Sequence, residues 1–245
     1  MSLLLGQLNV IGRHFSAMAA PAVASTILHG FPTSSTSVLT RFALHLRGIE
    51  FEEQTMEVKT RSDGMPDAVG QKPYLEAEGR RIEQPGAIFN YINELHVPGQ
   101  KSLLPDDLSA RAMSRKLATM ASTEIAPFGY YRVDRFLIEE LKVDKNGLDK
   151  WKTHWLEHGF SELEKVLSDP QAMCLDNACI VPKHGTYLVG DSPTMADVFI
   201  QPLVHWSQTN PDLAQRVDLS PFPILKKTYE NCLQLPAFQK AIPKL

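Results

Sequence analysis

Cysteine is scarce in this sequence, and its placement fits none of the usual cysteine motifs. The 245 residues include three, at Cys174, Cys179 and Cys232. They form neither an even-numbered disulfide framework nor a C-x-x-C pair. This usage predicts free thiols in a reducing compartment; a disulfide between Cys174 and Cys179 is the less favoured alternative.

An excess of positive charge and long apolar runs are also missing. The 25 Lys and Arg residues are balanced by 28 Asp and Glu residues, and the formal net charge is -3. Nucleic acid is therefore not an expected partner, because its phosphates require a basic surface. No apolar run approaches the roughly 20 residues that cross a bilayer, so we expect no membrane partner. We find no Gly-rich phosphate loop, no serine hydrolase motif and no metal-ligand spacing.

Acidic residues are absent from the start of the chain, where the first one is Glu50. Residues 1–24 include Arg13, and this composition is weakly typical of a mitochondrial transit peptide. A single arginine is weak evidence for such a peptide, however. We favour a disordered extension upstream of a second possible start at Met18, and therefore a cytoplasmic protein, with a mitochondrial location as the alternative.

Regular patterning begins at Ser25 and predicts a small mixed sheet with helices over residues 25–97. Apolar residues recur at helical spacing before Gly48, which stands where a left-handed C-cap is expected. A second helix follows Gln84. The predicted strands lie at 25–31, 49–58, 73–77 and 80–83. The order β-α-β followed by β-β-α is typical of an α+β domain.

Helical patterns dominate the rest of the chain. Residues 98–104 read as a linker punctuated by proline and glycine, and Thr194 with Asp197 has the pattern of a capping box. We predict an all-helical domain over 105–245. Its helices are expected near 106–141, 148–167, 194–207 and from 224 to the C-terminus, with a loop at 168–186.

Several of these segments, in the same order, resemble a known family. Thr33–Ile49 (TSSTSVLTRFALHLRGI) is similar to the Ser-Ser-Cys-Ser-Trp-Arg-Val-Arg segment of zeta-class glutathione transferases, which include maleylacetoacetate isomerase. Gln84–Leu95 (QPGAIFNYINEL) resembles their glutathione-contacting turn and helix. The likeness continues at 103–115, 155–167, 187–202 and 217–243. It implies the cytosolic glutathione transferase fold: a thioredoxin-like N-terminal domain that binds glutathione and an all-α C-terminal domain that binds the substrate.

The resemblance also implies a catalytic group at the first helix. Ser34 or Ser35, beside Thr36, would donate a hydrogen bond to the glutathione sulfur. A hydroxyl donor and the positive end of a helix lower a thiol pKa from about 8.5 to roughly 6 to 7. Taken alone, these residues favour a helix-capping role; the wider resemblance favours the catalytic one.

Two further points of glutathione contact are implied. Pro73 resembles the family's cis-proline, which leaves the backbone of Lys72 free to pair with glutathione; by itself it reads as an ordinary proline at a strand start. Gln84 and Pro85 occupy the place of the Gln-Ser dipeptide that receives the γ-glutamyl carboxylate.

The sequence departs from the family pattern at several of these positions. Thr36 replaces the family's cysteine, and Val38-Leu39 replaces a Trp-Arg pair. Pro85 offers neither the hydroxyl nor the N–H that a serine provides. The segment 59–72 is shorter than usual, so we expect a helix that helps to hold glutathione to be abbreviated or absent.

The resemblance places the substrate pocket near residues 125–133. Tyr130 and Arg132 are candidates for holding an acidic or phenolic ligand, although Arg132 reads equally well as a solvated charge on a helix. Thr209 stands where maleylacetoacetate isomerases tend to have an arginine, so we expect a bulkier or less anionic substrate. Trp151 and Trp155, four residues apart, predict packing.

We weigh three functions. The first is a glutathione-dependent cis-trans isomerase of an activated double bond in a specialised metabolic pathway. The second is a transferase that conjugates glutathione to electrophiles. The third is a glutathione-independent enzyme, or a ligand-binding or interaction module, on the same fold. The resemblance further implies glutathione as cofactor and a homodimer.

Overall fold

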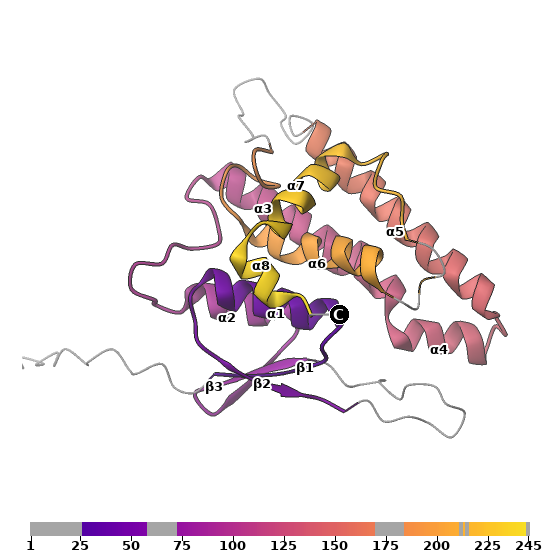
Figure 1. Cartoon of the computed structure of the whole chain (residues 1–245), viewed down its shortest axis with the longest axis horizontal. Helices are drawn as coiled ribbons and strands as arrows, with labels where there is room; N and C mark the ends of the chain where they lie inside the picture. Colours follow the sequence, from indigo (N-terminus) through magenta and orange to yellow (C-terminus); the bar gives the residue numbers. More distant parts are fainter. Residues whose placement is uncertain (1–25, 58–72, 170–183, 211–212, 214–215, 244–245) are drawn as a thin grey trace, which may run out of the picture.

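The computed structural model describes residues 26–57, 73–169, 184–210, 213 and 216–243. In this part of the chain a small sheet lies below a layer of helices, with further helices above them (Figure 1). The strands are β1 (Ile27–Gly30), β2 (Glu52–Thr55), β3 (Tyr74–Ala77) and β4 (Arg80–Glu83). The helices are α1 (Ser35–Leu46), α2 (Pro85–Glu94), α3 (Leu108–Met120), α4 (Tyr131–Glu139), α5 (Lys145–Ser168), α6 (Met195–Thr209), α7 (Pro223–Leu233) and α8 (Pro236–Ala241).

The sheet is mixed, with strand order β2-β1-β3-β4. β1 and β2 are parallel because the crossover helix α1 separates them, whereas β3 pairs antiparallel with both β1 and β4. Glu78 and Gly79 make the β3–β4 turn with φ of 52° and 70°, the left-handed pair that a two-residue hairpin requires. The register brings Leu28 opposite Leu75, and both are fully buried.

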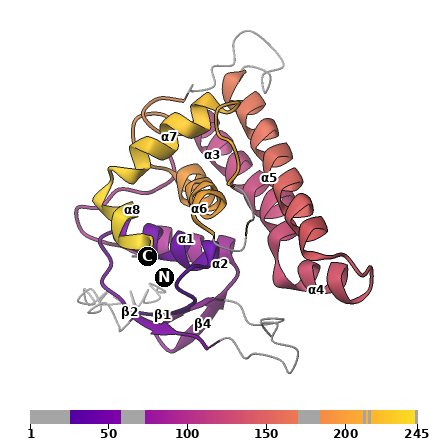
Figure 2. The same cartoon turned by 45° about the vertical axis from the view of Figure 1, so that its right-hand side comes forward.

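Helices α1 and α2 cover one face of the sheet (Figures 1 and 2). Phe42, Ile88 and Phe89 of these helices are fully buried, and the rings of Phe42 and Phe89 pack against Phe238 of α8 and Phe199 of α6. The predicted C-cap is confirmed: Gly48 has φ of 60° and its N–H donates to the carbonyl of His45. Each element of the predicted sheet domain is therefore present.

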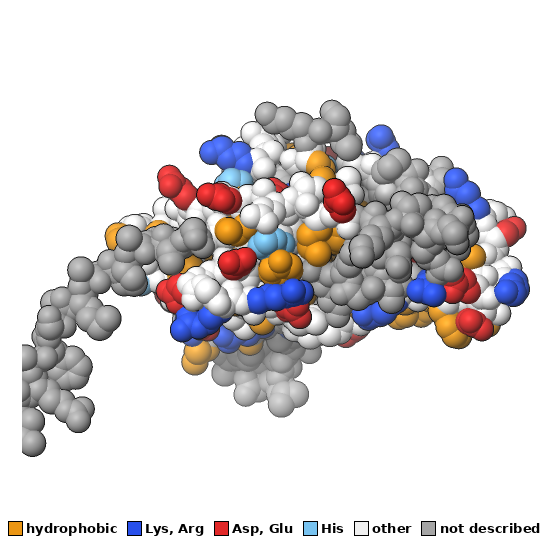
Figure 3. Space-filling view, turned by 90° about the horizontal axis from the view of Figure 1, so that it is seen from below, with side chains coloured by type: hydrophobic (Ala, Val, Ile, Leu, Met, Phe, Trp, Pro, Cys, Tyr) orange, Lys and Arg blue, Asp and Glu red, His pale blue; other side chains and the backbone are white. Residues whose placement is uncertain are grey.

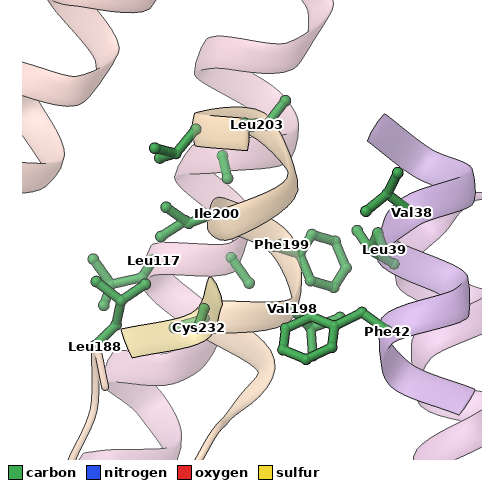
Figure 4. Close-up of a cluster of buried hydrophobic side chains, with 14 of the residues drawn as sticks. Val38, Leu39, Phe42, Leu117, Leu188, Val198, Phe199, Ile200, Leu203 and Cys232 are labelled. Atoms are coloured by element: carbon green, nitrogen blue, oxygen red, sulfur yellow. The ribbon is translucent and has the colours of Figure 1, made fainter. Parts of the chain in front are cut away.

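The remaining helices form an all-α part centred on α6, which Figure 2 shows nearly end on. The predicted capping box is confirmed, because Asp197 accepts from the Thr194 N–H at 2.9 Å at the start of α6. Figure 4 shows Val38, Leu39 and Phe42 of α1 facing the apolar residues of α6. One hydrophobic core therefore runs from the sheet part into the helical part.

Two predicted helices are interrupted. The helix expected over 106–141 ends after α3, passes through a π-helical turn (Ala121–Ile125) and a 3-10 turn (Ala126–Gly129), and restarts as α4. Pro127 explains the break, because it cannot donate to a preceding carbonyl. The helix expected from 224 onwards is divided before Pro236 for the same reason.

The observed arrangement has the predicted fold class, a thioredoxin-like sheet part followed by an all-α part. The exact domain limits at 25–97, 98–104 and 105–245 stay predictions. No described helix is both long and apolar enough to cross a membrane. Among the same residues, no group of three or more His, Cys, Asp or Glu side chains is placed to hold a metal. On the face in Figure 3, acidic and basic side chains are interspersed.

Candidate active site

A cavity of about 720 Å³ lies between the sheet part and the helical part. We call lining residues 31–36, 56, 73, 84 and 85 the sheet-side wall, and the lining residues between 122 and 210 the helical wall. The cavity brings together every described residue that the sequence placed in the site, namely Ser34, Ser35, Thr36, Pro73, Gln84, Pro85, Tyr130 and Arg132. Lys72 and the rest of the segment 59–72 lie outside the described residues, and with them the Lys72–Pro73 peptide bond.

The start of α1 faces the cavity with an uncapped end. Ser34 is the N-cap residue, but its hydroxyl makes no capping hydrogen bond. The first intrahelical bond is donated by Val38 to the carbonyl of Ser34 at 2.9 Å. The backbone N–H groups from Ser35 to Ser37 therefore come before the first intrahelical hydrogen bond. Together with the helix dipole, they favour a negative charge in the cavity.

The loop that leads into α1 is held by a hydroxyl from within the helix. The buried Ser37 accepts a hydrogen bond from the N–H of Phe31 at 3.0 Å. A Cβ at Gly30 would lie 2.6 Å from that same hydroxyl oxygen, so this close approach requires glycine. The loop that leads to Ser34 and to the start of α1 at Ser35 thus has a defined path.

Arg41 of α1 holds the same loop through hydrogen bonds to its backbone. It is 5% exposed, and Nε donates to both carboxylate oxygens of Glu53 at 3.0 Å. Nη2 donates to the carbonyls of Phe31 and Pro32 at 3.2 and 3.1 Å, and Nη1 donates to the carbonyl of Ala241 at 2.6 Å. Sequence reasoning did not assign this role. The available signal was an arginine among the apolar residues of an amphipathic helix.

Gln84 has an unusual backbone at the start of α2. Its φ of 74° is in the left-handed region, at a cost of about 1 to 3 kcal/mol, and strain of this kind is concentrated at ligand sites. Its ψ of 131° is the value that a following proline favours. Pro85 occupies the first turn of the helix, where a missing N–H is tolerated.

The helical wall contributes Tyr130 and Arg132. The guanidinium carbon of Arg132 lies 4.8 Å from the centre of the Tyr130 ring. Burial raises the pKa of Tyr130, and the nearby charge of Arg132 acts in the opposite direction. Tyr130 therefore remains protonated at neutral pH and can donate a hydrogen bond. Arg132 is exposed to solvent.

Aromatic side chains form much of the same wall. Trp155 stacks on Phe128 with ring centres 4.1 Å apart, and Trp151 donates to the carbonyl of Phe128 at 2.9 Å. The sequence predicted packing for both tryptophans. Trp155 also lines the cavity, which that interpretation missed, and Trp206 of α6 lines it as well.

A buried ion pair in the helical wall was also missed. Nζ of Lys152 on α5 lies 2.8 Å from Oδ2 of Asp134 on α4, and the two side chains are 8% and 6% exposed. Both residues line the cavity. Each reads in the sequence as an ordinary charge on a helix, so the sequence carried no signal for the pair.

Comparison with known proteins finds isomerases and glutathione S-transferases that are similar to this chain. No family model matches the chain. Maleylpyruvate isomerase from a Ralstonia species is 28% identical over 222 residues, which cover 88% of this chain and 96% of the relative. A holo structure of maleylpyruvate isomerase, described as a bacterial zeta-class glutathione S-transferase, has a TM-score of 0.73 at 28% identity and covers 89% of this chain and 96% of its own.

A third similar protein is maleylacetoacetate isomerase from Methylobacterium extorquens AM1, solved with bound malonate and glutathione. Its TM-score is 0.70 at 25% identity, with 89% of this chain and 96% of that chain covered. The fold is therefore that of the cytosolic glutathione transferases. Within this class, the similar proteins that we find are zeta-class glutathione transferases and maleylacetoacetate or maleylpyruvate isomerases.

Proposed function

We propose that the protein is a glutathione-dependent cis-trans isomerase of an activated double bond. The observation that carries the proposal is a single cavity in which Ser34 and Ser35 at a helix start face Tyr130 and Arg132 of the helical wall. The names of the similar proteins support it, since the Ralstonia relative is an isomerase and the Methylobacterium structure holds glutathione.

The sheet-side wall fits glutathione better at one end than at the other. At α1, uncapped amides and the Ser34 hydroxyl suit a thiolate. At α2, the Gln84 side chain has donors for a carboxylate, and the amide of Gly86 precedes the first intrahelical bond, from Ile88 to Gln84. Pro85 contributes no donor. Glutathione is therefore accommodated with fewer donors at its γ-glutamyl end.

The residues of the two walls divide the work of the reaction. When bound, glutathione supplies a thiolate that adds reversibly to the double bond, so that the bond rotates as a single bond before the thiolate leaves. Ser34 or Ser35 donates a hydrogen bond that keeps the sulfur ionised. Tyr130 and Arg132 are donors for the substrate oxygen on which negative charge develops.

A calorimetric titration with glutathione, followed by product analysis, tests the proposal. We expect saturable binding and, with a cis-configured conjugated ketone, a glutathione-requiring product of unchanged mass. A product heavier by one glutathione would instead establish the conjugating transferase. Absence of glutathione binding would overturn both, in favour of the glutathione-independent alternative that Pro85 suggests.

We further propose a homodimer in the cytoplasm. Exposed apolar side chains support association, notably Leu108 at 75% and Phe136 at 56% exposure. Light scattering at micromolar concentration should give the mass of two chains, and the mass of one 27.4 kDa chain would refute the dimer. A C-terminal fluorescent fusion should be cytoplasmic; mitochondrial fluorescence would favour the transit-peptide alternative.

A further inference from the structure

The Asp134–Lys152 pair occupies the substrate side of the cavity and has no part in the function described so far. Its atoms are 2.8 Å apart, and both side chains are almost completely withdrawn from solvent. The two residues come from neighbouring helices, α4 and α5, and both line the cavity. An ion pair is therefore built into a wall that also contains the rings of Phe128, Trp155 and Trp206.

Stability of the fold does not by itself require this pair. Replacing a buried ion pair by apolar residues of similar volume is often neutral or stabilising, because desolvation offsets the attraction between the charges. In ligand cavities, by contrast, a few well-placed polar groups fix the orientation of an apolar ligand. The position of Asp134 and Lys152 in a cavity wall points to this second role.

Lys152 has the capacity to bind a ligand while it remains paired. An ammonium group carries three N–H donors, so a bond to Asp134 leaves donors for an oxygen in the cavity. Arg132 lines the same cavity but is exposed, so water competes for its donors. The buried Lys152 acts in a medium of lower dielectric, where a fixed donor is more effective.

The surroundings of the pair indicate the kind of ligand. The stacked rings of Phe128 and Trp155, together with Trp206, offer flat apolar surfaces in the same wall. The pair itself has no net charge. It therefore suits a neutral oxygen that becomes negative during reaction better than the permanent charges of a dicarboxylate.

We propose that Lys152 donates a hydrogen bond to the carbonyl oxygen of a conjugated ketone carried on a flat aromatic frame, and that Asp134 positions Lys152 for it. The inference rests on the proposed function, whose substrate class it narrows. When a nucleophile adds to the conjugated double bond, electrons move onto this oxygen. The ammonium group then stabilises the charge through the hydrogen bond and keeps its proton.

The variants must separate ligand binding from folding. Lys152→Met alone leaves the Asp134 carboxylate buried without its cation and is expected to destabilise the protein. The double variant Asp134→Leu/Lys152→Met removes both charges at similar volume. A matched control is Glu162→Leu/Lys165→Met, because this pair lies 2.7 Å apart on α5 but is exposed and does not line the cavity.

Binding is measured with trans-4-phenylbut-3-en-2-one, with trans-1-phenylbut-1-ene as the analogue that lacks the carbonyl, and with maleate. Quenching of tryptophan fluorescence reports affinity, since Trp155 and Trp206 line the cavity. We expect the double variant to bind the ketone at least about tenfold more weakly, as for one lost charge-assisted hydrogen bond. Its affinities for the hydrocarbon and for glutathione should change by less than about twofold.

An infrared difference spectrum measures the carbonyl band of the bound ketone, which would not shift if Lys152 had only a structural role. The carbonyl band of the bound ketone should lie at lower wavenumber in the wild type and in the control variant than in the double variant. Equal affinity and an equal band in the double variant would overturn the role of Lys152. Tighter binding of maleate than of the ketone would overturn the substrate class. Ketone binding that depends on Lys152 without glutathione binding would refute the proposed function alone.

Discussion

The two walls of the cavity present different kinds of chemical group. The sheet-side wall presents backbone amides and short hydroxyl side chains at the starts of α1 and α2. The helical wall presents aromatic rings and long charged side chains from the segment before α4 and from α4, α5 and α6. Backbone groups can hold the same cofactor whatever side chains surround them, whereas the helical wall changes with each substitution. The contrast supports the proposal that the sheet-side wall binds the cofactor and the helical wall selects the substrate.

The largest effect is expected on the stability of the helical part, through Asp197. This carboxyl is fully buried, and burial raises its pKa to about 6 despite hydrogen bonds from Leu188 and Thr194. Its pKa in the native state thus lies above that in the unfolded state, so the native state holds the proton more tightly. The resulting stabilisation is present below about pH 4 and is lost as the pH rises through 6, by about 3 kcal/mol.

Asp197→Asn tests this directly, because the amide does not titrate. The free energy of unfolding of the variant should lack the decrease that Asp197 causes between pH 4 and 6. Denaturant titrations followed by tryptophan fluorescence measure it, since all three tryptophans, Trp151, Trp155 and Trp206, lie in the helical part. If the free energy of unfolding changed with pH in the same way in the wild type and the variant, Asp197 would not be the cause of the decrease.

The next largest effect concerns the sheet-side wall. Ser34→Ala or Ser35→Ala should lower the glutathione-dependent kcat/KM by roughly 100-fold or more, the scale for a lost donor to a charged reacting atom. Ser34 makes no capping bond, so its variant should keep the wild-type melting temperature to within a few degrees. Thr36→Ala is the matched control and should cost less. Full activity in both serine variants would refute the thiolate assignment.

A smaller effect, and a gain, is expected at Pro85. Pro85→Ser restores a hydroxyl and an N–H, so glutathione should bind about tenfold more tightly by calorimetry. Pro85→Ala restores the N–H alone and should give part of the gain. Tight binding by the unmodified protein with no gain in either variant would mean that another group holds the carboxylate. The sheet-side wall would then have to contain a further hydrogen-bond donor for that carboxylate.

The sequence could place Ser34, Ser35 and Thr36 together in the sheet-side wall because they are neighbours in the chain at a helix start. Ser34, Ser35 and Thr36 are consecutive, and Gly48 and the Thr194–Asp197 box are local signals that fix helix ends. The fold class was predictable for the same reason, since it follows from the order of short local patterns. The features that could be predicted are therefore those that a few neighbouring residues specify, such as helix ends and the order of strands and helices.

The helical wall was less predictable, since its contacts join distant residues. The apolar spacing continues through Pro127, so the sequence suggested one helix where the chain breaks and presents Phe128 to the cavity. Asp134 and Lys152 meet because α4 and α5 pack together, which no local pattern specifies. The residues to which we assign substrate selection are therefore brought together by tertiary packing.

The hydrogen bond from Arg41 to the carbonyl of Ala241 spans 200 residues of sequence. During synthesis the chain emerges from its N-terminus, and the sheet and α1 become available to fold long before α8 has been translated. Until then, Arg41 has its partners in β2 and in the Phe31–Pro32 loop but not its partner in α8. A nascent chain halted before α8 should therefore show the sheet formed while the loop that carries Ser34 is still incompletely fixed. Completion of the site in this sense awaits the synthesis of α8.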